Sequence, residues 1–386
     1  MEEIEKIFFE NPQIKAKPKL FQKRFVFNCD DKEFTGYTIQ KIIVFINSIK
    51  KNYKKGNVPI HFNFSYNNIV IADKLSYVIF ECICYALKVK YGHEIHLSIK
   101  PKENILTSGV FSSPLLLLLN GSNKSSKKKY VDKFKFDIYS NHYRKVITKS
   151  SKEYLSIVFS DIFTFLNNFP ITDDSKEQIA EVVSELVGNA CEHTGSSCLI
   201  DLDVTEKHTE KDNPNPDEKF IGINIAVINF SGSLLGNDLE KKIRTNANLT
   251  ERYKELADIF EIHKEKMTGN EYDENDFWNV ACMQDRISGR MQYNKTGGTG
   301  STILINSLQK KAKEDNCYVL SGRNVLYYKK EMLNYDNNEW ISFNNTNFHD
   351  DIPSRKVIGR CPVYIPGTAY NLNFVLRVEG EEDDND

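Results

Sequence analysis

The spacing of apolar residues changes several times along the first third of the chain. Residues Pro59–Ile71 alternate between apolar and polar side chains, which predicts strands, and Ser76–Lys90 has apolar residues every three or four positions, which predicts a helix. Alternation resumes over Glu94–Lys100, and an earlier helical stretch covers Thr38–Tyr53. This order of elements predicts a small mixed α/β domain over residues 1–130.

A second domain with longer elements follows. Helices are predicted over Lys152–Phe169 and Asp173–His193, and strands over Leu199–Val204 and Ile221–Phe230. The charged region Leu235–Asp276 is expected to be partly helical. These changes of period divide the rest of the chain into a domain over residues 131–320, a β-rich extension over 321–378 and an acidic, disordered tail over 379–386.

Composition narrows the class of protein. The formal net charge of −2 gives no reason to expect a nucleic-acid or anionic-membrane partner. The longest apolar run, Leu115–Leu119, is too short to span a bilayer, and no secretory signal opens the chain, so a cytoplasmic protein is expected. The eight cysteines lack paired Cys-x-x-Cys spacing, which favours free thiols over a zinc site.

The predicted helix Asp173–His193 carries two separate stripes. Its apolar stripe has the spacing of a core face and consists of Ile179, Val182, Val183, Leu186, Val187 and Ala190. Its polar stripe consists of Glu181, Glu185, Asn189, Glu192 and His193. Gly188 and Asn189 are poor helix formers, and glycine costs about 1 kcal/mol relative to alanine. The sequence therefore indicates that an amide at 189, with little bulk beside it, serves some purpose; a face turned to water is the alternative.

Glu185 and Asn189 lie one helical turn apart, which suits phosphate chemistry. The carbonyl oxygen of Asn189 could be a magnesium ligand, since this ion takes few protein ligands and prefers oxygen. The Glu185 carboxylate could orient or deprotonate a water for attack on a γ-phosphate. His193, one turn further, could donate a hydrogen bond to a phosphate oxygen.

The segment Glu185–His193, ELVGNACEH, resembles the N-box of the GHKL family of ATPases, whose core is Glu-x-x-x-Asn. The resemblance implies that ATP and Mg²⁺ are the cofactors, that Glu185 is the hydrolytic base and that Asn189 binds the metal. It covers about 149–313 and is closest to anti-sigma-factor serine kinases and their relatives. It implies a two-layer α/β sandwich, the Bergerat-type ATP-binding fold. The N-terminal domain resembles a STAS domain, the usual partner of those kinases.

A glycine-rich segment, KTGGTGST at Lys295–Thr302, precedes a predicted helix over Ile303–Lys311. Backbone amides of such a loop can approach an anion closely, and a following helix N-terminus favours negative charge. The segment lacks the Walker A lysine, and a structural turn is the alternative. It resembles the GHKL G2 box, in the lid over the triphosphate. By that resemblance the nucleotide-contacting residues are Gly297, Gly298, Thr299, Gly300, Ser301 and Thr302.

Between these motifs the family has a strand ending in Asp-x-Gly-x-Gly, whose Asp accepts the adenine amino group. Here the predicted strand ends in Asn229, followed by Ser231 and Gly232, and these residues occupy the adenine-binding positions by resemblance. Asn229 can accept from an amine but brings no charge, and Ser231 stands where glycine is expected. This departure puts adenine preference in doubt.

The leading functional hypothesis is an ATP-controlled regulatory switch with slow ATPase activity, in which nucleotide closes the Leu235–Ser301 segment. Residues Pro366–Thr368 before an alternating strand resemble the ends of ATP-binding proteins of bacterial conflict systems, which implies a role in anti-phage defence. Two alternatives stay open: an anti-sigma-type serine/threonine kinase that uses Glu185 as base, and an interaction module with a decayed site. A co-encoded effector or regulator is the expected protein partner, and homodimer formation stays open. His142 is interpreted as a surface or helix-capping histidine, not a phosphoacceptor.

Overall fold

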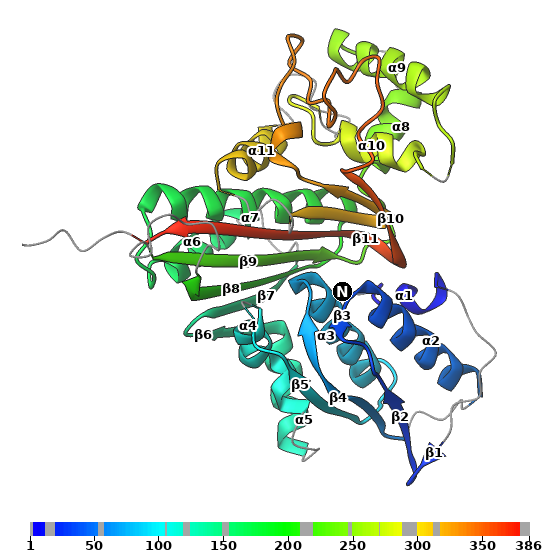
Figure 1. The fold of residues 1–386 in the computed structure, drawn as a ribbon, viewed down its shortest axis with the longest axis vertical. Coiled ribbons are helices and arrows are strands. Elements are labelled where there is room, and N and C mark those ends of the chain that lie inside the picture. The colour runs from blue at the N-terminus through cyan, green and yellow to red at the C-terminus, as the bar shows by residue number, and fades with distance from the viewer. Residues whose placement is uncertain are drawn as a thin grey trace, which may run out of the picture.

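The computed structural model describes residues 3–11, 20–52, 58–104, 106–118, 124–148, 154–208, 219–245, 249–269, 271–287, 299–311 and 317–378. These residues form an α/β protein with two sheets (Figure 1). One sheet is mixed and mostly parallel, and the other is antiparallel with six strands. All eight cysteines are free thiols, as expected. In the described part of the chain, no helix combines the length and the apolar character that a bilayer span requires.

The N-terminal unit is built on the mixed sheet. Its strands are β1 (Leu20–Phe21), β2 (Arg24–Asn28), β3 (Glu33–Phe34), β4 (Ile60–Ile71) and β5 (Ile95–Pro101). The long β4 pairs in parallel with β2, β3 and β5, whereas β1 and β2 form an antiparallel pair. The helices of this unit are α1 (Lys6–Phe9), α2 (Gly36–Asn52), α3 (Lys74–Val89), α4 (Thr107–Ser112) and α5 (Lys124–Lys135), with a 3₁₀ helix at Pro114–Leu118.

The apolar spacing that predicts the helix near residues 76–90 corresponds to α3. Asp73 caps this helix, because its carboxylate accepts a hydrogen bond from the Ser76 backbone N–H at 2.7 Å. The helix begins at Lys74, two residues before the predicted start. The carboxyl ends of β3 and β4 lead directly into α2 and α3, so both helices begin at one edge of the parallel sheet.

The six-stranded sheet has the order β10-β11-β9-β8-β7-β6, and every neighbouring pair is antiparallel. Its strands are β6 (Phe136–Tyr139), β7 (His142–Ile147), β8 (Cys198–His208), β9 (Phe220–Asn229), β10 (Tyr318–Tyr327) and β11 (Ile358–Arg377). The predicted boundary between residues 320 and 321 falls inside β10. The end of β10 and the whole of β11, both in the expected β-rich extension, therefore belong to this sheet, with β11 between β10 and β9.

Helices α6 (Tyr154–Leu166), α7 (Asp173–Thr194) and α11 (Thr299–Lys311) cover one face of this sheet (Figure 1). We call it the helical face. Helix α7 begins at Asp173, as predicted, and its cap is Thr172, which accepts from the Ser175 N–H at 3.2 Å. The charged region expected to be partly helical forms α8 (Asn237–Thr245), α9 (Glu251–Lys264) and the start of α10 (Glu274–Ala281), and a 3₁₀ helix lies at Lys330–Met332.

The opposite face of the six-stranded sheet packs against the N-terminal unit (Figure 1). We call it the docking face. Along β8, Ile200, Leu202 and Val204 belong to the core under α6 and α7, whereas Leu199 belongs to the core of the N-terminal unit. Because successive side chains of β8 point to opposite faces of the sheet, this one strand contributes to two separate cores.

Helix α5 begins at Lys124, and the predicted domain boundary at residue 130 falls inside that helix. The tail 379–386 and the glycines Gly297 and Gly298 lie outside the described residues.

Candidate functional site

Glu185 and Asn189 lie on the middle of α7, and both side chains are half-buried. Glu185 is close enough to Tyr370 of β11 for its charge to act on the phenol. Burial is the main reason that the pKa of Tyr370 is raised, and the negative charge of Glu185 adds to it. The carboxylate is therefore near β11 on the helical face of the sheet.

Helix packing does not require a glycine at position 188. A Cβ atom at this position would lie 3.4 Å from both methyl carbons of Leu155 in α6, which is an ordinary van der Waals contact. The space between α6 and α7 therefore admits an alanine beside Asn189.

Asn229 at the end of β9 reaches α7. It is 2% exposed, and its Nδ2 donates to the carbonyl oxygens of Ala190 at 3.2 Å and Ser197 at 3.3 Å. Ala190 follows Asn189 directly. The structure therefore brings the expected adenine-binding asparagine to the helix that carries the expected magnesium ligand.

The start of α11 is the third part of this region. The helix begins at Thr299, four residues before the predicted Ile303, and it packs on α7. Thr302 is half-buried and donates to Asp285 Oδ1 at 2.5 Å. Thr299, Gly300 and Ser301 form the first turn of the helix, but their side chains are outside the described part of the structure, as is the side chain of His193 at the end of α7.

Ser231 and Gly232 form a turn that faces elsewhere. Gly232 has a φ of +78°, and a Cβ atom there would lie 2.6 Å from Lys6 Nζ and 2.7 Å from Glu3 Oε2, so the turn contacts the N-terminal unit. Ser231 Oγ accepts from the Ser233 N–H at 3.1 Å and closes the turn on itself. Of the three adenine-binding candidates, only Asn229 contacts α7 among the described residues.

A second group of functional side chains lies on the docking face and was not predicted from the sequence. Seven buried polar residues from three elements meet there, and we call them the interface network. They are Lys74, Tyr77 and Glu81 of α3, His142 and Arg144 of β7, and Asp201 and Asp203 of β8.

Register and helical spacing explain how these residues meet. In the β7–β8 pair, His142 lies opposite Asp203 and Arg144 lies opposite Asp201, so all four side chains share one face of the sheet. On α3 the contributing residues are spaced by three and four positions, which places them on one side of the helix. Two strands and one helix thus each present a polar row to the same buried layer.

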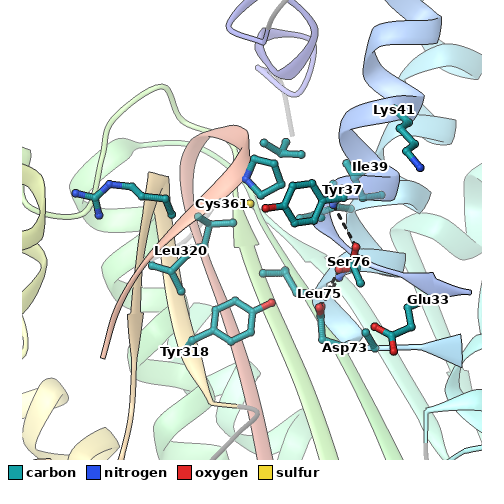
Figure 2. Close-up of a pocket in the computed structure, with 18 of the residues that line it drawn as sticks. Glu33, Tyr37, Ile39, Lys41, Asp73, Leu75, Ser76, Tyr318, Leu320 and Cys361 are labelled. Atoms are coloured by element: carbon teal, nitrogen blue, oxygen red, sulfur yellow. Dashed lines mark hydrogen bonds between the residues drawn. The ribbon is translucent and has the colours of Figure 1, made fainter. Parts of the chain in front are cut away.

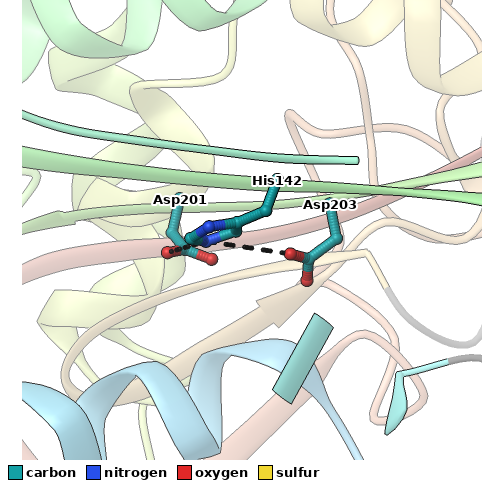
Figure 3. Close-up of side chains that lie close together, drawn as sticks. All are labelled: His142, Asp201 and Asp203. Carbon is teal, nitrogen blue, oxygen red and sulfur yellow. Dashed lines mark hydrogen bonds and ion pairs between the residues drawn. The ribbon is translucent and has the colours of Figure 1, made fainter. Parts of the chain in front are cut away.

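Asp201 is the centre of the interface network. Its carboxylate accepts from His142 Nε2 at 3.0 Å (Figure 3). It also accepts from Arg144 Nε at 2.5 Å and pairs with the Lys74 ammonium. Burial alone would raise the pKa of Asp201, but Arg144, Lys74 and His142 together hold it well below its usual value. His142 is fully buried, so its interpretation as a surface or capping residue was wrong.

Asp203 and Glu81 complete the ion pairs. Asp203 pairs with Lys74 and accepts from the Tyr77 hydroxyl at 2.6 Å. Glu81 pairs with Arg144, yet burial raises the pKa of the Glu81 carboxyl. Each of the three carboxylates, Glu81, Asp201 and Asp203, therefore pairs with a cation that belongs to the other unit.

The network includes a set of possible metal ligands. One ligand atom from each of His142, Asp201 and Asp203 lies within 4.8 Å of the others. However, both carboxylates already pair with Lys74, and Asp201 also pairs with Arg144, so a metal ion would compete with two side-chain cations. The arrangement therefore favours docking of the two units through ion pairs over metal binding.

No family model, curated protein or solved structure matches this chain.

Proposed function

We propose that this chain binds ATP with magnesium where α7, the end of β9 and the first turn of α11 meet, and that it acts as a nucleotide-controlled switch with slow ATPase activity. The observation that carries the proposal is the contact of Asn229 with Ala190. Because Ala190 follows Asn189, the expected adenine acceptor and the expected magnesium ligand lie at one junction of strand and helix.

The orientation of Asn229 supports a role as an acceptor. Both partners of its amide are carbonyl oxygens, so Nδ2 must face them and Oδ1 is directed away from them. A carbonyl oxygen in that position suits the exocyclic amine of adenine. An aspartate here would set a negative charge against the carbonyls of Ala190 and Ser197, which gives a physical reason for the departure from the family pattern.

Glu185 supports the hydrolytic part of the proposal. A half-buried carboxylate whose charge reaches Tyr370 can hold a water and accept its proton. Asn189 would hold the metal through its amide oxygen one turn away. Bound magnesium would neutralise charge on the β- and γ-phosphates.

The same proposal extends to the fold of each unit. The six-stranded sheet under α6, α7 and α11 would be a Bergerat-type sandwich, and the N-terminal unit would be STAS-like. A co-encoded protein is the expected recipient of the nucleotide signal.

The test is equilibrium binding of ATP by calorimetry, with and without Mg²⁺, followed by phosphate release. We expect magnesium-dependent binding that Asn189→Ala weakens by about tenfold or more. Glu185→Gln should keep binding and lower phosphate release by about 10²-fold or more.

Glu177→Gln is the matched control, because Glu177 is an exposed carboxylate on the same helix. It should leave both measurements unchanged. Absence of magnesium-dependent ATP binding by the unaltered chain would contradict the proposal.

A further inference from the structure

A cavity of about 650 Å³ lies between the two units, away from α7 (Figure 2). One wall is formed by the starts of α2 and α3, and the other by β10 and β11. In parallel sheets, ligands bind where loops leave the carboxyl ends of the strands, and the loops after β3 and β4 open into this cavity. Its volume suits a small organic molecule.

The lining is largely apolar and aromatic. Tyr37 and Tyr318 extend from opposite walls (Figure 2), and the ring of Tyr318 lies 5.7 Å from that of Tyr327, centroid to centroid. The apolar lining comes from both units and consists of Ile39, Leu75, Ile79, Leu320, Val325 and Val363. A ligand with a flat or compact apolar body would bury its surface on both sides.

The cations in the lining are already paired. Lys41 Nζ donates to Asp31 at 2.5 Å. The guanidinium of Arg360 donates to both oxygens of Asp276, at 2.8 and 2.6 Å, and Asp276 is not part of the lining. Each of these positive charges is therefore already balanced by a carboxylate, which weakens its attraction for an anionic ligand.

Two further carboxyl groups, Glu33 and Asp73, line the cavity, and burial raises the pKa of Asp73, so Glu33 is the main source of negative charge. Glu33 is exposed at the lining and, among the described residues, makes no ion pair. Asp73 caps α3 by accepting from the Ser76 N–H and hydroxyl at 2.7 and 2.9 Å, and Tyr318 also donates to it. The positive end of α3 is therefore already satisfied by a carboxylate, and an added anion would be repelled.

We propose that this cavity is a binding site for a small organic cation, an amine or amidine on an aromatic or alicyclic body. The Tyr37 and Tyr318 rings would receive the body, and Glu33 at the mouth would receive the charge. The proposal does not depend on nucleotide binding at α7.

Such a ligand would contact both units at once. Its contacts on α3 include Asp73 and Leu75, which flank Lys74 of the interface network. Its other contacts lie on β10 and β11 of the six-stranded sheet. Occupancy would therefore stabilise the docked arrangement of the units and raise the thermal midpoint of the whole chain.

The experiment uses three compounds that share an indole body and differ in charge: tryptamine, 3-ethylindole and indole-3-propionate. Calorimetry on the full chain at pH 7 should show the order tryptamine, then 3-ethylindole, then indole-3-propionate, with tryptamine about tenfold tighter than the anion. Glu33→Gln should weaken tryptamine several-fold and leave 3-ethylindole unchanged.

Two more variants locate the binding. Ala72 is exposed and lines the cavity, so Ala72→Trp should fold and abolish binding of tryptamine by occupying the space. Glu103→Gln, an exposed carboxylate outside the lining, should leave binding unchanged. The proposal is overturned if tryptamine does not bind, if indole-3-propionate binds as tightly, or if Ala72→Trp retains full affinity.

Discussion

The two faces of the six-stranded sheet are both buried, but they bury different kinds of side chain. The helical face buries aliphatic and aromatic side chains under α6, α7 and α11. The docking face buries Asp201, Asp203, His142 and Arg144 against α3, although these residues come from the same strands. The helical face is held mainly by apolar contact, whereas the docking face combines apolar contact, for example at Leu199 and Ile228, with a buried set of paired charges.

The difference shows what each type of contact specifies. Apolar contact is insensitive to small shifts, whereas ion pairs between α3 and two strands require one relative position of the units. Asn371 adds to this, because its Oδ1 accepts from the Leu75 backbone N–H at 3.0 Å near the start of α3. The ion pairs of the docking face thus fix the orientation of the N-terminal unit, while each face of the sheet contributes to its own apolar core.

The largest expected effect comes from breaking the charge pairing on the docking face. Arg144→Met leaves Glu81 and Asp201 buried without the guanidinium that pairs with both. We expect a loss of about 3–5 kcal/mol in the free energy of unfolding, measured by urea denaturation at pH 7.

Arg355→Met is the control, since Arg355 forms an exposed pair with Glu271 and should give no measurable change. Equal urea midpoints for Arg144→Met and the unaltered chain would remove the distinction between the two faces.

Acid should weaken the docking face and not the helical face. The pKa of Asp201 is depressed in the folded chain, so the stability contributed by its ionised form is complete above the unfolded-state value near 3.8 and is lost as the pH falls toward the lower folded value. Glu81 acts in the opposite sense, because burial raises its pKa. Urea midpoints between pH 7 and pH 3 should fall, and Asp201→Asn should make the fall shallower; an unchanged slope would contradict the role of Asp201.

A smaller effect is expected from Gly109, which packs on the docking face. A Cβ atom there would lie 2.0 Å from Asp203 Oδ2 and 2.9 Å from Tyr77 Oη, and Lys74 holds both groups in place. Gly109→Ala should therefore destabilise the chain by about 1–3 kcal/mol in urea denaturation. Unchanged stability would mean that Asp203 can move, and that the network tolerates displacement.

The smallest effect, of opposite sign, is expected from the glycine on the helical face. In Gly188→Ala, the new Cβ would meet only the methyl carbons of Leu155 at 3.4 Å, which can shift slightly. Removing a mid-helix glycine should then stabilise the chain by up to about 1 kcal/mol. If instead stability is unchanged and ATP affinity falls, the glycine serves the ligand and not helix packing.

Local periodicity was sufficient to identify most elements of the fold. The predicted helices at 152–169 and 173–193 correspond to α6 and α7, and the predicted strand at 221–230 corresponds to β9. The position of β11 between β10 and β9 could not be predicted, because strand pairing joins residues far apart in sequence and leaves no local pattern. Residues 321–378 were for that reason expected to be a separate extension.

The proposed nucleotide region was visible in the sequence because Glu185 and Asn189 interrupt an otherwise ordinary helix. The interface network was not visible. The alternating pattern Asp201-Leu202-Asp203 is expected in a strand whose polar face lies in water. It is equally expected in a strand whose polar face is buried against charged side chains of another unit. Only the position of α3, with Lys74 and Glu81, distinguishes the two cases.

The position of β11 inside the six-stranded sheet affects how the chain can fold while it is being synthesised. On the ribosome, β8 and β9 emerge long before β11, whose Thr368 pairs with Asn229. Until then one edge of β9 has no permanent partner, and β10 cannot join the sheet at all. Nascent chains halted before residue 358 should accordingly be sensitive to protease and prone to associate through that open edge, even with the N-terminal unit fully made.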